Sequence, residues 1–244
     1  MADPLAPLLV LPGVADAVGA ARDAVAEVHR HPANRRGWPA TAAEASVRAA
    51  RASAAIEGGD PGLPVEGQVS DPVLAGTLRV ADSIGMLLST WRRAPAQALA
   101  RLHVLAAADL TAELGRPRAA GDVSVRLELL AKLVAGGTAA PAPVLVAVVH
   151  GELLALHPFV TSNGVVARAA ARLTMITTGL DPKGLAVPEV SFLRRSAEYA
   201  SALDGFRAGE PDGVARWLVF NCEALQAGAG EAMSIANAVS HAST

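Results

Sequence analysis

The stretch HPFVTSNGVVAR, residues 157–168, ends one apolar segment and begins the next. Pro158 disfavours helical geometry at the residue before it, so the chain turns at His157. The letters TSNG that follow are typical of a helix N-cap. The pattern therefore predicts a loop between two helices, with free backbone N–H groups at the start of the second helix, where a phosphate or carboxylate binds favourably.

The composition favours an all-α protein around this loop. The chain has 244 residues, of which 52% are apolar but only 3% aromatic. Its apolar side chains are mainly Ala, Leu and Val, which suit closely packed helices, whereas a strand-rich sheet favours more Ile, Tyr and Phe. A chain of this length fits one large domain, or a core with a smaller appendage, around a substantial apolar interior.

Apolar residues at helical spacing predict the positions of the helices. Thr41 is predicted to cap the second helix, with Glu44 three residues later as in a capping box. The Gly- and Pro-rich segment GGDPGLPVEGQVSDP separates the first two helices from the others. We expect an N-terminal helical region (1–70), a core (71–227) and a C-terminal tail that frays (228–244). The helices are expected at 14–30, 41–57, 73–93, 95–114, 124–135, 143–156, 163–178, 190–207 and 212–227.

Charge and cysteine content limit the partners of the chain. The formal charge is −2 and long basic runs are missing, so we expect no nucleic-acid partner. A small acceptor or a protein partner is favoured instead. The single cysteine, Cys222, lies in the apolar stretch WLVFNCEAL and is expected to be buried rather than nucleophilic. One cysteine also fits a reducing, cytoplasmic compartment.

Two apolar segments raise the question of a signal peptide or a membrane span. The N-terminal segment carries Asp3 and several prolines and lacks a basic start, which argues against a signal peptide. The segment APVLVAVVHGELLALHPF is interrupted by His150 and Glu152 before it reaches the length of a bilayer span. We therefore expect a buried core helix and no membrane contact.

His157 is the first candidate for chemistry. An imidazole at the end of a helix, beside a loop, titrates near neutral pH and acts as a general base when an acceptor hydroxyl lies within hydrogen-bond reach. Taken alone, a capping or satisfied core histidine is the more common role. Two other histidines, His103 and His150, show no ligand spacing with each other, so we expect no metal site from them.

Charged residues suggest an anion site and an internal partner for it. Arg168 lies one turn inside the second helix and adds positive charge beside its N-terminus, and Arg172 lies one turn further on the same side. Glu57 comes directly before Gly58 and so ends its helix, where the helix dipole repels a carboxylate. A cationic partner elsewhere would remove that cost. Without one, Glu57 is a solvated surface glutamate.

Together these residues resemble the signature of the Fic family (Fic/Doc, or Fido, fold). The signature is HPF, any residue, Asp or Glu, Gly or Ala, Asn, Gly, Arg, two residues, Arg. The residues that match it are His157, Pro158, Phe159, Asn163, Gly164 and Arg168. The chain departs from it at Thr161, Ser162 and Val165.

A second motif lies upstream, in the order used by one Fic subgroup. SAAIEG, residues 53–58, resembles the inhibitory motif of Fic proteins with an N-terminal regulatory helix, which is Ser or Thr, three residues, Glu, then Gly or Asn. Residues 116–126 occupy the place of the family's flap, where we expect an extended segment or a short β-hairpin. The resemblance covers roughly residues 40–225 and implies an all-α Fic-type helical bundle.

The resemblance also implies a role for each matched residue. Typical members transfer AMP from ATP to a hydroxyl of a protein, with magnesium held by the acidic residue of the signature. Arg168 would hold a phosphate or, in an inhibited state, pair with Glu57. The implied roles of the others are base (His157), anion hole (Ser162, Asn163, Gly164), inhibitory motif (Ser53, Gly58) and loop anchor (Pro158, Phe159).

The departures leave two functions open. Thr161 offers one neutral hydroxyl where a carboxylate should hold Mg²⁺, so the Mg²⁺ and ATP expected for the family would be held poorly. Val165 removes a second positive charge. One reading is a divergent transferase, autoinhibited by Glu57, that moves AMP or another phosphate-containing group from a nucleotide-like donor to a protein hydroxyl. The other is an inactive Fic-like module that binds a ligand or a protein, and the resemblance is compatible with a homodimer.

Overall fold

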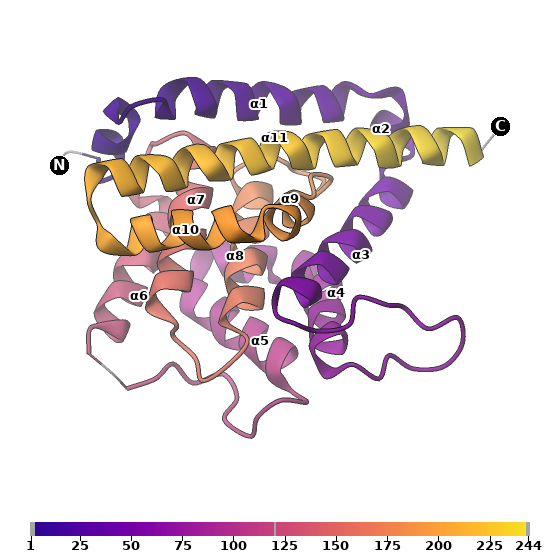
Figure 1. Ribbon diagram of the computed structural model, residues 1–244, viewed down its shortest axis with the longest axis horizontal. Coiled ribbons are helices and arrows are strands. Elements are labelled where there is room, and N and C mark those ends of the chain that lie inside the picture. Colours follow the sequence, from indigo (N-terminus) through magenta and orange to yellow (C-terminus); the bar gives the residue numbers. More distant parts are fainter. Residues whose placement is uncertain (1–2, 120, 243–244) are drawn as a thin grey trace.

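The computed structural model describes residues 3–119 and 121–242, and in these residues the chain forms helices and no strand (Figure 1). The predicted all-α class is therefore confirmed. A 3₁₀ turn, η1 (Ala6–Val10), and a π turn, η2 (Leu133–Gly137), accompany the α-helices. These are α1 (Val14–Arg30), α2 (Pro32–Arg36), α3 (Trp38–Ile56), α4 (Pro72–Arg93), α5 (Pro95–Ala107), α6 (Val123–Lys132), α7 (Ala142–Leu156), α8 (Asn163–Thr177), α9 (Pro188–Arg194), α10 (Ser196–Ala208) and α11 (Pro211–Ala242).

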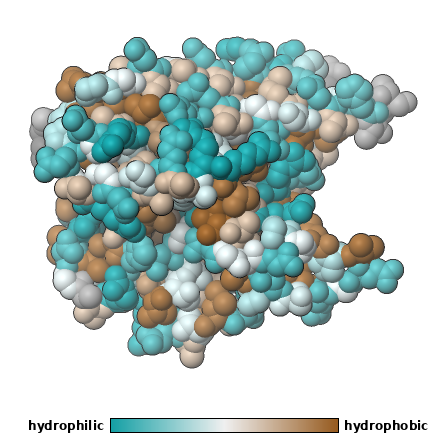
Figure 2. Space-filling model, viewed as in Figure 1, coloured by the Kyte–Doolittle hydropathy of each residue, from teal (hydrophilic) through white to brown (hydrophobic). Residues whose placement is uncertain are grey.

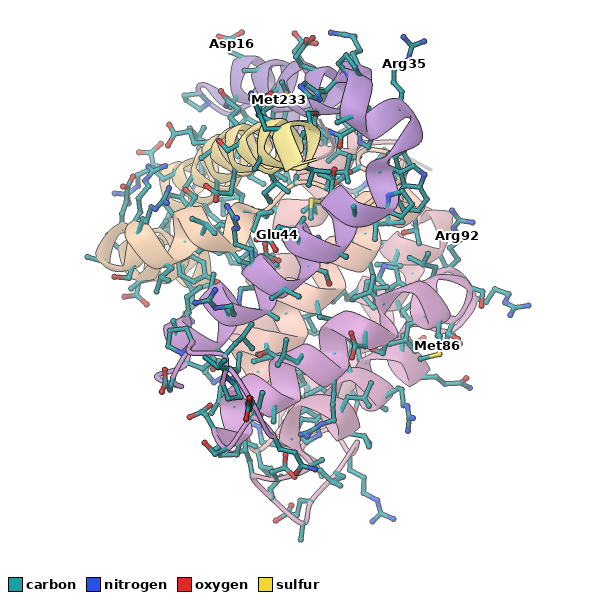
Figure 3. All side chains as sticks on the ribbon, turned by 90° about the vertical axis from the view of Figure 1, so that its right-hand side faces the viewer. Asp16, Arg35, Glu44, Met86, Arg92 and Met233 are labelled. Atoms are coloured by element: carbon teal, nitrogen blue, oxygen red, sulfur yellow. The ribbon has the colours of Figure 1, made fainter. Side chains whose placement is uncertain are left out.

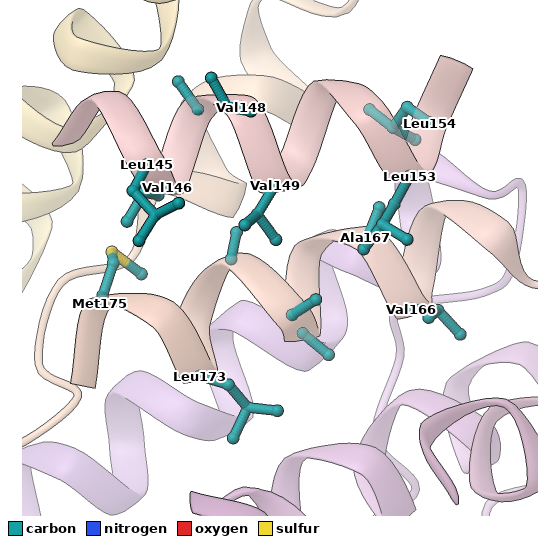
Figure 4. Packing of buried hydrophobic residues seen from close by; sticks show 14 of the residues in the cluster. Leu145, Val146, Val148, Val149, Leu153, Leu154, Val166, Ala167, Leu173 and Met175 are labelled. Carbon is teal, nitrogen blue, oxygen red and sulfur yellow. The ribbon is translucent and has the colours of Figure 1, made fainter. Parts of the chain in front are cut away.

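The antiparallel helices α7 and α8 form the centre of the fold. Most residues of both helices are buried. Figure 4 shows their side chains meeting along the pair, with Leu153 and Ala167 towards one end and Val146 and Met175 towards the other. Because the loop 157–162 joins these two helices, their packing fixes both ends of the loop.

Helices α1 and α11 lie side by side along one edge of the molecule (Figure 1). The expected fraying of residues 228–244 is wrong for their described part, because α11 continues to Ala242. Ala229 and Ala232 are buried against α1, and Ile235 is buried against α3. A helix of this kind is stabilised by the packing of its apolar face more than by its intrinsic propensity.

Helix α3 crosses the molecule next to α4, α9 and α11 (Figure 3). Its contacts use small buried side chains, among them Ala45, Ala49 and Ala50. Figure 2 shows a notch in the outline between the end of α11 and the loop that follows α3. A groove between the two helices is lined by Ala40, Ala43, Glu44, Val47 and Arg48 of α3 and by Ile235, Ala238 and Val239 of α11.

Several helix boundaries differ from the prediction. α3 begins at Trp38 and not at Thr41, because a proline in the first turn of a helix interrupts no hydrogen bond and Pro39 is therefore tolerated. Thr41 lies buried inside the helix, so the predicted capping box is wrong. α5 ends at Ala107 instead of 114. The helix expected at 190–207 is two helices, α9 and α10, with a break at Arg195.

Among the described helices, α4 is long and apolar enough to cross a membrane by length and composition alone. It packs against α3, α5 and α8 and buries Leu74, Leu87 and Trp91, as a helix of a folded core does. Its outer side carries the exposed Met86, which points away from the molecule in Figure 3. The apolar character of α4 is therefore explained by its position in the bundle.

Candidate active site

The loop between α7 and α8 has an unusual backbone. His157 and Ser162 adopt left-handed conformations, with φ angles of 46° and 57°. For residues other than glycine such a conformation costs about 1–2 kcal/mol. Ser162 is the N-cap residue of α8, but its side chain makes no capping hydrogen bond. The loop therefore holds its shape through other contacts.

Asn163 supplies two of these contacts. Its side-chain Oδ1 accepts a hydrogen bond from the backbone N–H of Phe159, and its Nδ2 donates to the backbone oxygen of Phe159, both at 2.9 Å. The two bonds fix the distance between Phe159 and Asn163 and so restrain the loop between them. Asn163 thus holds the loop through its side chain, while its backbone begins α8.

Phe159 lies in the core, as the prediction of a loop anchor requires, with only 2% of its surface exposed. Its ring stacks on His103, with ring centroids 4.2 Å apart and planes 6° from parallel. Nδ1 of His103 accepts a hydrogen bond from the N–H of Gly115 at 2.9 Å, which requires an unprotonated nitrogen. Burial lowers the pKa of His103 and favours this neutral form. His103 therefore connects the loop to the segment after α5.

The N-terminus of α8 presents free donors to the space that the Glu57 carboxylate fills, which is called the pocket below. In the described part of the chain, the backbone N–H groups of Asn163 and Gly164 have no acceptor. The carboxylate of Glu57 lies directly over Gly164, since a Cβ at that position would overlap Oε1 of Glu57. Glu57 therefore occupies the place where a helix N-terminus attracts an anion.

Glu57 reaches this place from the C-terminal end of α3. Gly58 has φ of 82°, and the bonds from Gly58 N–H to Ala55 O and from Gly59 N–H to Ala54 O end the helix in a Schellman motif. Only a residue that tolerates positive φ suits the position after Glu57. The end of the helix is thereby fixed, and with it the direction of the glutamate side chain.

Arg168 is the cationic partner that the position of Glu57 calls for. Its Nη2 lies 2.8 Å from Oε1 of Glu57, and the two side chains are 2% and 29% exposed. The Nε of Arg168 donates to Oγ of Ser53 at 2.9 Å, and Nη2 also donates to the Ser53 backbone oxygen at 3.2 Å. The residues of the upstream motif and of the loop motif therefore meet, although 111 positions separate Glu57 from Arg168.

A buried polar chain lies behind Arg168. His150 is 1% exposed, with Nδ1 at 2.9 Å from Oδ1 of Asn221 and Nε2 at 2.7 Å from the hydroxyl of Tyr199. Because burial lowers the pKa of His150 to about 3, the ring is neutral and carries one proton. The amide oxygen of Asn221 accepts that proton's hydrogen bond, so Nε2 accepts from Tyr199.

The same chain orients Tyr199 towards the arginine. Burial raises the pKa of the Tyr199 hydroxyl to about 12, although Arg168 acts in the opposite direction. Burial alone would lower the pKa of Arg168, but Tyr199 and Glu57 oppose burial and raise it. Since the hydroxyl proton of Tyr199 points to His150, its oxygen lone pairs are left for the guanidinium. The charge of Arg168 is therefore stabilised from two sides.

The flap segment does not form the β-hairpin that was one of the expected forms. Its described residues (116–119 and 121–126) contain no strand, and α6 begins at Val123. Arg118 attaches the segment to the loop: its backbone N–H donates to Pro158 O and its Nε to His157 O, both at 2.7 Å, and Nη2 donates to Leu156 O at 3.1 Å. The segment is thus fixed to the C-terminus of α7.

His157 ends α7 and is exposed, and it lies close enough to Glu57 for the glutamate to act on its pKa. Its Nε2 lies 3.1 Å from Nη2 of Arg207, a residue of α10. Partial burial, Arg207 and Arg118 lower the pKa of His157, and Glu57 acts against them. The imidazole is therefore kept neutral, with Nε2 as the acceptor of the Arg207 hydrogen bond. A neutral imidazole has a lone pair on Nε2 that can accept a proton, as a general base must.

Two further positions near the motif, Arg172 and Val165, do not contribute to the anion site. Arg172 is not at the anion site; it forms a buried ion pair with Glu189 at 3.1 Å and donates to two backbone oxygens of the loop before α9. Val165 is 5% exposed and lines an apolar seam with Val80 and Ile84 of α4. A core residue therefore stands where the signature has the first of its two arginines, and the second is present as Arg168.

The residues around position 161 do not fit a magnesium ion. Thr161 contributes one neutral hydroxyl, and the carboxylate closest to the anion site, that of Glu57, is paired with Arg168. No cluster of three or more His, Cys, Asp or Glu suited to a metal occurs in the residues that the structure describes. Mg²⁺ prefers anionic oxygen ligands in octahedral geometry, and this chain offers none of its own here.

Solved Fic structures resemble the chain over most of its length. A Fic family protein from Desulfovibrio desulfuricans G20 has a TM-score of 0.72 and 20% identity, and the match covers 92% of this chain and 75% of that one. Two structures of Fic-1 from C. elegans, one of a point variant, have TM-scores of 0.70 and 0.66 at 16% and 15% identity, covering 91% of this chain and 72% of each of theirs. No protein-family model matches, and no curated protein is similar in sequence. The chain therefore has the Fic fold, as its two motifs predicted.

Sequence reasoning missed several residues that support the site. The sequence holds one usable signal, the polar residues His150 and His103 inside otherwise apolar helices, since a buried polar group needs a partner. No local signal marks the arginines, because their role depends on where distant helices lie. The missed residues are His103, Arg118, His150, Tyr199, Arg207 and Asn221.

Proposed function

We propose that the protein is a divergent Fic-type transferase that moves AMP or another phosphate-containing group from a nucleotide-like donor to a protein hydroxyl. The observation that carries this proposal is the carboxylate of Glu57, which lies at the N-terminus of α8 and pairs with the buried Arg168. A pocket that holds an internal anion in this way has the donors to hold a phosphate once Glu57 leaves.

In this proposal, Glu57 is an inhibitor that competes with the donor. When it moves away, the N–H groups at the start of α8 and the guanidinium of Arg168 bind a phosphate of the donor. The acceptor hydroxyl then attacks the phosphorus atom to be transferred: the new O–P bond forms, the bond to the leaving group breaks, and the hydroxyl proton passes to Nε2 of His157. No step is assigned to a metal, because the residues around Thr161 do not fit one.

The alternative is an inactive Fic-like module that binds a ligand or a protein. Two observations favour it: Thr161 replaces the acidic residue of the signature, and Val165 lies in the apolar seam instead of the pocket. Each lost electrostatic contact of this kind costs about 10²–10³ in rate by analogy with other anion holes. The pocket geometry is shared by both readings, so an activity measurement has to separate them.

The test compares the full chain with the variants Glu57→Gly and His157→Ala. Each is incubated with labelled ATP, CTP, UTP, GTP or a phosphocholine donor, with and without Mg²⁺ or Mn²⁺, and protein labelling is measured. We expect labelling, including self-labelling, by Glu57→Gly and its loss in the double variant with His157→Ala. If Glu57→Gly gives no labelling with any donor, the transferase proposal fails and the binding module remains. If labelling survives His157→Ala, the assigned base is wrong.

A further inference from the structure

Arg207 occupies Nε2 of His157, the atom that accepts the hydroxyl proton in the proposed reaction. Its Nη2 donates to Nε2 of His157 at 3.1 Å, and the same nitrogen donates to the backbone oxygen of Leu154 at 3.0 Å. A hydroxyl that is to lose its proton to Nε2 has to take the position of this guanidinium N–H. The acceptor and Arg207 therefore compete for one lone pair.

The ion pair that holds Arg207 is weak, so an acceptor can compete with the guanidinium for His157. Its ion-pair partner is Asp204, one turn earlier on α10, at 3.1 Å, and the two side chains are 39% and 72% exposed. Exposed pairs of this spacing contribute only about 0.3–0.5 kcal/mol. The guanidinium can therefore leave His157 without breaking a strong ion pair, provided that it finds another partner.

The surroundings of His157 lack such a partner for Arg207 and carry an excess of positive charge. Arg118 also lies next to His157 and donates to backbone oxygens at the end of α7. In the residues that the structure describes, Arg118 has no carboxylate within ion-pair distance, and Asp204 is the only one that Arg207 has. Two arginines thus act on the base, whereas the carboxylates near it are the exposed Asp204 and Glu57, and Glu57 is paired with Arg168.

The chemistry of proton transfer adds a second reason for Arg207 to move. When His157 accepts the hydroxyl proton it becomes a cation, and a guanidinium 3.1 Å away would destabilise that cation. Moving Arg207 onto an anion reduces this repulsion.

We propose that Arg207, together with Arg118, selects the acceptor: the protein segment that brings its hydroxyl to His157 carries a carboxylate side chain next to that hydroxyl. The carboxylate draws Arg207 away from Nε2 and opens the base to the hydroxyl. This inference rests on the proposed function, because it assumes that a group is transferred to the acceptor hydroxyl. The binding preference that it predicts can be measured without any transfer.

The experiment uses full-length protein with Glu57→Gly and two matched peptides, each with a central Thr flanked by two Glu or by two Gln residues. Binding is measured by fluorescence anisotropy, and the ring signals of His157 are followed by NMR during the titration. We expect the Glu peptide to bind about fivefold to tenfold more tightly and to shift the His157 signals, because two exposed arginines contribute modestly each. Raising the salt concentration should reduce the difference.

Added substitutions identify the arginine responsible. Arg207→Gln should reduce the preference to less than about twofold, Arg207→Lys should retain part of it, and Asp204→Asn should increase it, since Asp204 competes for the same guanidinium. Arg30→Gln is the matched control, because Arg30 is also an exposed arginine with an acidic partner three residues earlier on its helix. It should leave the preference unchanged.

Equal binding of the two peptides, no binding of either, or a preference that survives Arg207→Gln would overturn the inference. These outcomes are separate from the fate of the proposed function. Labelling by Glu57→Gly without a preference for acidic peptides means that only the acceptor inference fails. A preference for acidic peptides with a shift at His157, but no labelling from any donor, means that only the transferase proposal fails.

Discussion

Replacing Glu57 with Gln should make the protein less stable and, at the same time, able to bind phosphate. Removing one partner of a buried ion pair costs about 3–5 kcal/mol. The Glu57 side chain is 29% exposed and Arg168 keeps its bonds to Ser53, so we expect about half of that cost, roughly 2 kcal/mol. For a chain of this size, this corresponds to a fall in Tm of about 4–8 °C.

Phosphate should then restore what the substitution removes. With the carboxylate gone, the α8 N-terminus and Arg168 are open to an anion, and a ligand at 100 times its Kd stabilises by about 2.7 kcal/mol. Thermal melts of the parent and of Glu57→Gln, with and without inorganic phosphate or ATP, measure both effects. Glu44→Gln is the control, since Glu44 is on the same helix in an exposed pair with Arg48 and should change the free energy of unfolding by less than about 0.5 kcal/mol.

Two results of this assay would show that Glu57 does not fill an anion site. One is an equal phosphate-induced rise in Tm for the parent and for Glu57→Gln, which would place the phosphate elsewhere. The other is a Glu57→Gln variant as stable as the parent and unresponsive to phosphate at every concentration. A rise in Tm confined to the variant is the expected result.

Three further predictions concern the same pocket. In a Glu57→Gln background, Tyr199→Phe should weaken the binding of phosphate by about fivefold to tenfold, because Arg168 loses the oxygen that stabilises it. The control Thr174→Val removes a buried hydroxyl elsewhere in α8 and should leave binding unchanged. Isothermal titration calorimetry measures both. Gly164→Ala should displace the Glu57 carboxylate and lower Tm. It should not create the phosphate response of Glu57→Gln, because the new methyl group fills the place of the anion. A variant as stable as the parent would contradict the assigned geometry. Burial holds the pKa of His150 at about 3, below its unfolded value of about 6.5. The free energy of unfolding should therefore be highest above pH 6.5 and fall by up to about 5 kcal/mol as the pH is lowered towards 3. Urea unfolding at several pH values should show this fall, and His150→Gln should make the pH dependence weaker.

Local sequence was sufficient for much of the fold and for part of the site. Helical spacing and composition predicted the all-α class, and Pro158 marked the turn into the loop. Gly58 predicted the end of α3 and therefore an exposed carboxylate at Glu57 that needs a cation. These features depend on near neighbours in the chain, so they can be inferred without a tertiary structure. Two motifs in the right order then predicted the Fic fold and the meeting of Glu57 with Arg168.

Tertiary packing decided the remainder. The end of the chain is rich in Ala and Ser, which suggested a frayed tail, yet α11 is helical to Ala242 because α1 and α3 cover its apolar face. Arg172 has the right spacing for the anion site, but the loop before α9 brings Glu189 to it instead. Arg207 comes within 3.1 Å of His157 only because α10 packs beside the end of α7. Sequence spacing fixes which face of a helix a side chain occupies, whereas the partner on that face depends on which distant helix packs against it.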